Sequence, residues 1–121
     1  MTDAARLYGN VARQIASPRD LEAGLLLEAA SRLQAVRDDW NGKRKNLDNA
    51  LRYNRQLWTI FMTAVTGNDN RLPKEIRQNV ANLGLFVMKQ TIATIGDPKP
   101  EQLGSLININ REIAGGLMAR S

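Results

Sequence analysis

Apolar residues recur along the chain in steps of three and four, and asparagines interrupt the stripes they form. One stripe consists of Leu47, Leu51, Asn54, Trp58, Phe61 and Val65. Another consists of Leu103, Leu106, Asn110, Ile113 and Leu117. Residues at this spacing lie on one face of an α-helix. The pattern therefore predicts amphipathic helices that carry an amide in the middle of the apolar face.

Three asparagines stand in such stripes: Asn54, Asn82 and Asn110. A buried amide without hydrogen-bond partners costs about 1–3 kcal/mol, so each needs a partner if it is buried. One interpretation is that these amides bond across the core and fix the register of the helices, as buried asparagine does in coiled coils. The other is that they line a groove that receives another chain. Both interpretations point away from catalysis.

Capping and helix-breaking residues divide the chain into five predicted helices. Ser17 and Pro18 form a helix start, because serine can cap and proline suits the first helical position. Gly42 is expected to end that helix in a left-handed conformation. The expected helices cover residues 3–16, 18–40, 47–66, 73–95 and 101–118. The prediction is an all-α, compact bundle of about five helices, forming one domain over residues 1–121.

The fourth predicted helix carries two apolar stripes. The first consists of Ile76, Val80, Leu83 and Val87, and the second of Leu85, Met88, Ile92 and Ile95. A helix that is apolar on more than one face is usually central in its bundle, and central burial is the expectation here. The alternative is that one of the faces is a docking groove, to which flexible methionine side chains would be suited.

The composition excludes several kinds of chemistry. The chain has neither cysteine nor histidine, so it has no disulfide, thiolate nucleophile, Cys/His zinc site or imidazole base. It also lacks a glycine-rich phosphate-binding motif. We therefore expect a protein that is not an enzyme and needs no cofactor.

Charge and hydropathy set limits on location and partners. Seventeen basic and twelve acidic residues give a net charge of +5, which permits an acidic partner or RNA. The local basic cluster, Lys43–Arg44–Lys45, is interpreted as a solvated turn, with phosphate contact as the alternative. No window approaches the roughly 18 consecutive apolar residues of a membrane span. The first residues lack the pattern of a secretory signal, so a cytoplasmic protein without membrane insertion is expected.

Several segments of the chain together resemble the alphaproteobacterial FlaF family of flagellar biosynthesis regulators. They are residues 16–23, 29–34, 50–61, 72–73, 77–87 and 106–114, in the order expected for the family. The resemblance implies a small helical protein needed for flagellin production and filament assembly, acting alongside the regulator FlbT. It further implies flagellin as the partner, with roles in secretion as a chaperone and in post-transcriptional control. Direct binding to flagellin mRNA and a structural adaptor role for FlbT remain alternatives.

A docking surface for a flagellin helix is predicted on the third and fourth helices, which carry more apolar residues than one stripe can bury. Arginines on the same helices could hold acidic or carbonyl groups at the rim of a groove. Oligomeric state and the bound region of flagellin are left open. The predicted partner-binding residues are Arg55, Ile60, Met62, Arg77, Leu85, Phe86 and Met88.

Overall fold

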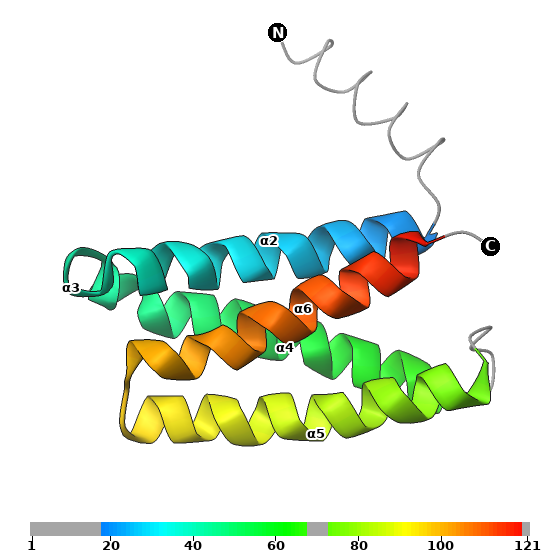
Figure 1. Ribbon diagram of the computed structural model, residues 1–121. Helices are drawn as coiled ribbons and strands as arrows, with labels where there is room; N and C mark the ends of the chain where they lie inside the picture. Colours follow the sequence, from blue (N-terminus) through cyan, green and yellow to red (C-terminus); the bar gives the residue numbers. More distant parts are fainter. Residues whose placement is uncertain (1–17, 68–72, 120–121) are drawn as a thin grey trace, which may run out of the picture.

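Four long helices surround a single core in the computed structural model, which describes residues 18–67 and 73–119 (Figure 1). The expected helix over residues 3–16 and the expected turn at residues 68–70 lie outside the described residues. The all-α prediction is confirmed, with four long helices in the described part against about five expected. The helices are α2 (Pro18–Asp38), the short α3 (Trp40–Lys43), α4 (Leu47–Thr66), α5 (Lys74–Gly96) and α6 (Leu103–Met118).

The predicted boundaries hold at some helix ends and fail at others. α4 has the expected bounds, and α5 begins directly after Pro73. The expected left-handed stop at Gly42 is wrong, because no described glycine has a positive φ. Instead α2 ends at Asp38 and the Asp39 carboxylate accepts a hydrogen bond from the Gly42 N–H at 3.3 Å, which caps α3. A 3₁₀ turn at Pro100–Gln102 delays the start of α6.

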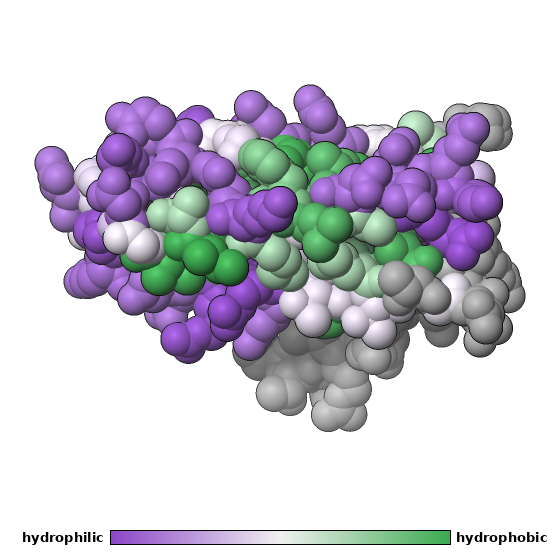
Figure 2. All heavy atoms as spheres, turned by 90° about the horizontal axis from the view of Figure 1, so that it is seen from below, coloured by the Kyte–Doolittle hydropathy of each residue, from purple (hydrophilic) through white to green (hydrophobic). Residues whose placement is uncertain are grey.

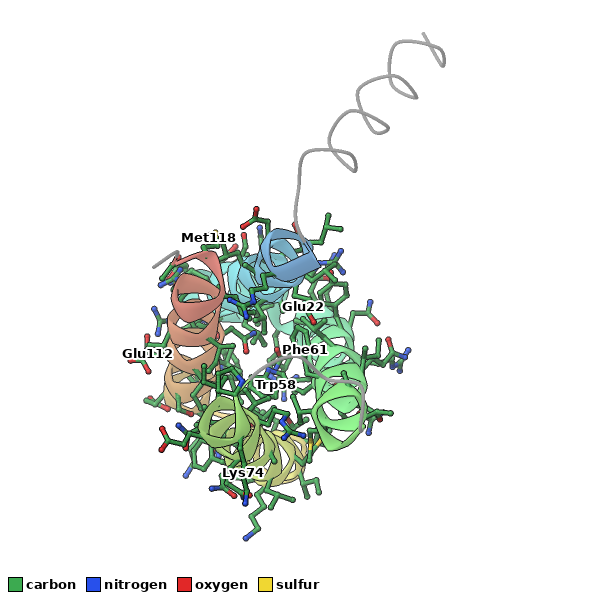
Figure 3. All side chains as sticks on the ribbon, turned by 90° about the vertical axis from the view of Figure 1, so that its right-hand side faces the viewer. Glu22, Trp58, Phe61, Lys74, Glu112 and Met118 are labelled. Atoms are coloured by element: carbon green, nitrogen blue, oxygen red, sulfur yellow. The ribbon has the colours of Figure 1, made fainter. Side chains whose placement is uncertain are left out.

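The helices pack in the order α2, α6, α5, α4 around the bundle (Figure 3). The most extensive packing is between α2 and α6, and α4 packs on both α2 and α5. α5 and α6 follow each other in the chain but make few contacts. Small side chains allow α2 and α6 to approach closely, and a hydrogen bond of 3.2 Å from Arg111 Nη2 to Gln34 Oε1 joins the two helices at the surface. The buried alanines of these two helices are Ala23, Ala29, Ala30 and Ala114.

A polar chain of three side chains crosses the core between α4 and α6. Asn110 Nδ2 donates to Asn54 Oδ1 at 2.6 Å, and the indole N–H of Trp58 donates to Asn110 Oδ1 at 2.8 Å. All three side chains are completely buried. The Phe61 and Trp58 rings meet edge to face, with centroids 6.0 Å apart and planes at 83°. The predicted cross-core role of Asn54 and Asn110 is therefore confirmed.

Asn82 does not share this role. Its side chain is exposed, and its Oδ1 accepts a hydrogen bond of 3.1 Å from Gln78 Nε2 on the same helix. The prediction that Asn82 is a buried register residue is wrong. Leu83, one residue further, is only partly buried, so the stripe that Asn82 adjoins lies at the edge of the core and not at its centre.

Candidate functional site

The outer side of α5 is an exposed apolar surface. Figure 2 looks onto this side of the bundle and shows hydrophobic residues across its middle, with hydrophilic residues above them. The expectation that α5 is central in the bundle is wrong: only Val80, Gly84, Val87, Thr91 and Thr94 are buried. Large apolar side chains on its other faces are between 43% and 69% exposed, and they are Ile76, Leu85, Phe86, Ile92 and Ile95.

A glycine brings α5 close to α4 in the middle of this surface. A Cβ atom at Gly84 would lie 2.5 Å from Met62 Sδ, so only glycine leaves room for Met62 in this arrangement. Met62 and Met88 are both half-buried. Ala81, Met88 and Ile95 are seven residues apart and share one flank of α5. Since Ala81 and Ile95 line clefts against α4, that flank faces α4.

We call this strip between the two helices the α4–α5 seam and define it as Arg55, Met62, Arg77, Leu85 and Met88. Its two arginines lie toward its two ends. Arg55 lines a cleft of about 270 Å³ together with Thr91 and Ile95. Arg77 lines a second cleft, of about 210 Å³, near the start of α5. The Nε atom of Arg77 is buried and has no hydrogen-bond partner within the described ranges. The two guanidinium groups therefore lie near opposite ends of an apolar strip.

Two of the predicted docking residues lie away from the seam. Ile60 is 64% exposed, and it is seven residues from Tyr53, whose ring lies 4.0 Å from the guanidinium carbon of Arg32 on α2. Ile60 is therefore on the flank of α4 that faces α2. Phe86 is four residues from Gln90, whose amide donates to the Gln102 carbonyl at the start of α6. Phe86 is thus on the α6 side of α5, so the structure places these two residues on other flanks than the seam.

A second apolar recess, which the sequence did not reveal, opens at one end of the bundle. Figure 3 looks into this end, with Phe61 and Trp58 in the interior and Glu22 above them, below the start of α2. A cleft of about 230 Å³ lies between the start of α5 and the end of α6, and a smaller one of about 30 Å³ adjoins it. We call the two together the end cleft. They share three lining residues: Val80, Ile113 and Leu117.

Charged residues of α2 and α6 stand at the margin of the end cleft. Glu22 lines the smaller part, and Arg19 and Glu112 line the larger part. Burial among apolar side chains raises the pKa of the Glu22 carboxyl, and the positive charge of Arg19 opposes that rise. The stripe containing Ile113 and Leu117 was visible in the sequence. The cleft itself was not, because it arises where α5 and α6 separate.

The basic cluster is at the opposite end of the bundle, in α3 and the 3₁₀ turn that follows. Lys43, Arg44 and Lys45 are exposed, in agreement with the solvated interpretation. The guanidinium carbon of Arg44 lies 5.3 Å from the centre of the Trp40 ring, which is a cation–π distance. No helix in the described part of the chain combines the length and hydropathy of a membrane span.

Comparison of the sequence with known protein families shows which family the chain belongs to. The family described as "Flagellar protein FlaF" matches residues 4–117 of the chain. The chain belongs to the FlaF family. No curated protein and no solved structure matches it.

The family match confirms the resemblance noted in the sequence and extends over almost the whole chain. All of α2, α4 and α5 and nearly all of α6 lie within the matched residues of this FlaF-family protein. The α4–α5 seam and the end cleft are therefore parts of the family domain and not additions to it. Residues 4–17, which precede the described bundle, also fall within the match.

Proposed function

We propose that this flagellar protein binds flagellin in the cytoplasm, as a non-enzymatic secretion chaperone that also adjusts flagellin synthesis. The observation that carries the proposal is the exposed apolar surface of α5 in a FlaF-family chain. Exposed apolar patches on a monomeric protein typically mark interaction sites. Flagellin's terminal regions are amphipathic and would self-assemble if uncovered, so they are natural partners for such a surface.

The proposed mode is a flagellin helix lying in the α4–α5 seam. An amphipathic helix presents apolar anchors at intervals of three, four and seven residues to a groove. Leu85, at 56% exposure, and the half-buried Met62 and Met88 provide apolar contacts in the middle of the seam. Methionine side chains adapt to irregular partners at low cost. The seam would therefore accept a helix without requiring one fixed pattern of anchors.

The arginines define the length and the chemistry of the proposed contact. Arg77 and Ile95 are eighteen residues apart on α5, which corresponds to roughly 27 Å of helix. A partner helix of about five turns would extend from the Arg77 cleft to the Arg55 cleft. Guanidinium groups bind carboxylates with two parallel hydrogen bonds and can also donate to free carbonyl groups, which favours acidic residues or a helix C-terminus at these positions.

The proposal is tested by measuring the affinity of alanine variants for purified flagellin monomer. Leu85→Ala and Met88→Ala should each weaken binding about thirtyfold, since loss of a buried anchor costs about 2 kcal/mol. Ile60→Ala is the matched control, because Ile60 is equally apolar and exposed but lies on the α2 side of α4. Each variant is first checked for cooperative thermal unfolding.

Other outcomes relocate or reject the site. Unchanged affinity in folded Leu85→Ala and Met88→Ala variants would remove flagellin from the seam. A loss with Phe86→Ala alone would move the contact to the α6 side of α5. Binding of flagellin mRNA with steep salt dependence, in the absence of flagellin binding, would instead support direct translational control through phosphate contacts.

A further inference from the structure

The end cleft is an apolar recess at the point where the described chain begins. α2 starts at Pro18, and Arg19 lines the larger part of the cleft. The walls come from the first turns of α5 and the last turns of α6, and Ile76 at the margin is 44% exposed. Figure 3 shows this end of the bundle, with the start of α2 next to the C-terminal end of α6. Any segment that precedes Pro18 must enter the molecule here.

The seventeen residues before Pro18 have the sequence pattern that such a recess accepts. Leu7, Val11 and Ile15 are spaced by four and form one apolar stripe if the segment is helical. As a helix, seventeen residues would be roughly 25 Å long, sufficient to cross the end of a four-helix bundle. The residue before a proline is disfavoured in the α conformation, so Ser17 is a natural place for the chain to change direction.

The segment and the margin of the cleft differ in the sign of their net charge. The segment has two arginines, Arg6 and Arg13, and one carboxylate, Asp3, whereas Glu22 and Glu112 stand with Arg19 at the margin of the cleft. Burial raises the pKa of the Glu22 carboxyl, so an additional positive charge nearby would stabilise its ionised form. Among the described residues Glu112 forms no ion pair, so its charge contributes to the negative margin of the cleft. The family match also begins at residue 4, within this segment.

From these observations we infer that residues 3–16 fold back and dock their Leu7–Val11–Ile15 stripe into the end cleft between α5 and α6. The end cleft is then an intramolecular interface that completes the core. The flagellin seam on the α4 side of α5 stays open in this arrangement. This inference does not depend on the proposed function, because its occupant is the chain itself.

A nitroxide label on the segment tests the inference, and the chain has no cysteine of its own to interfere. Gly9→Cys provides a single attachment site two residues from both Leu7 and Val11, on the opposite side of the predicted helix. In full-length ¹⁵N-labelled protein, the oxidised label should remove most of the amide signal of Ile76, Val80, Ile113 and Leu117. Reduction of the label should restore these signals.

Two further variants and one mixed sample make the result decisive. Val11→Asp places a charge in the stripe and should abolish the broadening, whereas Ile92→Asp, on the outer side of α5, should leave it unchanged. Undiminished signals in the end cleft, or broadening centred on Leu85 and Ile92, would overturn the inference. In a mixed sample, one protein carries ¹⁵N but no nitroxide and the other carries the nitroxide but no ¹⁵N. Broadening in that sample would overturn the inference in favour of docking into a second copy of the chain. No flagellin is present, so the result stands apart from the test of the seam.

Discussion

The contact between α4 and α6 and the outer side of α5 are built from similar residues, but the first is buried and the second is exposed. Both have apolar stripes with an asparagine in or beside them, yet Asn54 and Asn110 are completely buried and Asn82 is exposed. The apolar residues of α4 gather on one face, whereas those of α5 extend around the helix. One flank of α5 packs on α4, and no comparable packing against α6 covers the other. An amide in an apolar stripe thus indicates burial only where a neighbouring helix covers that stripe.

The largest expected effect comes from removing an aromatic side chain on the buried side of this comparison. Trp58→Ala should lower the free energy of unfolding by about 3–5 kcal/mol, because it leaves a large cavity and breaks the bond to Asn110. Ile92→Ala on the exposed side should change it by less than about 0.5 kcal/mol. Chemical denaturation of both variants measures the contrast. Equal losses would mean that the outer side of α5 is covered in solution.

The polar chain in the core gives the next largest effect. Asn110→Leu should cost about 2 kcal/mol, because it leaves the Trp58 indole N–H and the Asn54 amide buried without their partner. Adding Asn54→Leu should cost less than the same change does in the native protein, since its partner is already gone. A double-mutant cycle of unfolding free energies measures this coupling. Strictly additive losses would contradict the hydrogen-bonded pair.

Gly84, at the contact between α4 and α5, should tolerate only a small side chain. Gly84→Val should destabilise the protein by about 1–3 kcal/mol, because the added side chain meets Met62. Met62→Ala should relieve most of that loss, although it is itself mildly unfavourable. Thermal unfolding of the two single variants and the double variant checks the rescue. A full loss in the double variant would place the conflict elsewhere than at Met62.

The smallest expected effect concerns Glu22, a carboxyl at the edge of the core. Its pKa is raised in the folded state by burial, so the native state binds the proton more tightly than the unfolded state does. Stability attributable to this group therefore falls as the pH rises from the ordinary glutamate pKa through the raised one. Glu22→Gln should be slightly more stable at pH 7 and should lose this pH dependence. Unfolding midpoints measured from pH 4 to pH 7 test both expectations, and a less stable variant at pH 7 would contradict them.

Much of the helical architecture was predictable, because local signals decide it. Proline before α5 and the glycine after α4 marked those ends correctly. The helix end predicted at Gly42 was wrong, because the Asp39 side chain caps the short helix α3, which includes Gly42. The surface was predicted less well. Ile60 and Phe86 were assigned to the same groove as Met88, although they are on other flanks, because the flank that meets a neighbour depends on which helices become adjacent.

The pairing of α2 with α6 has a consequence for the order in which the bundle can form. The helix nearest the start of the described chain packs most extensively on the one nearest its end, so this contact closes a loop of more than sixty residues. Contacts between residues so distant in sequence slow folding, because the loop entropy is lost before the contacts form. During synthesis, Asn54 and Trp58 have no partner until Asn110 has emerged. The core formed by α2, α4 and α5 therefore stays incomplete until α6, the last of the described helices to be synthesised, packs against them.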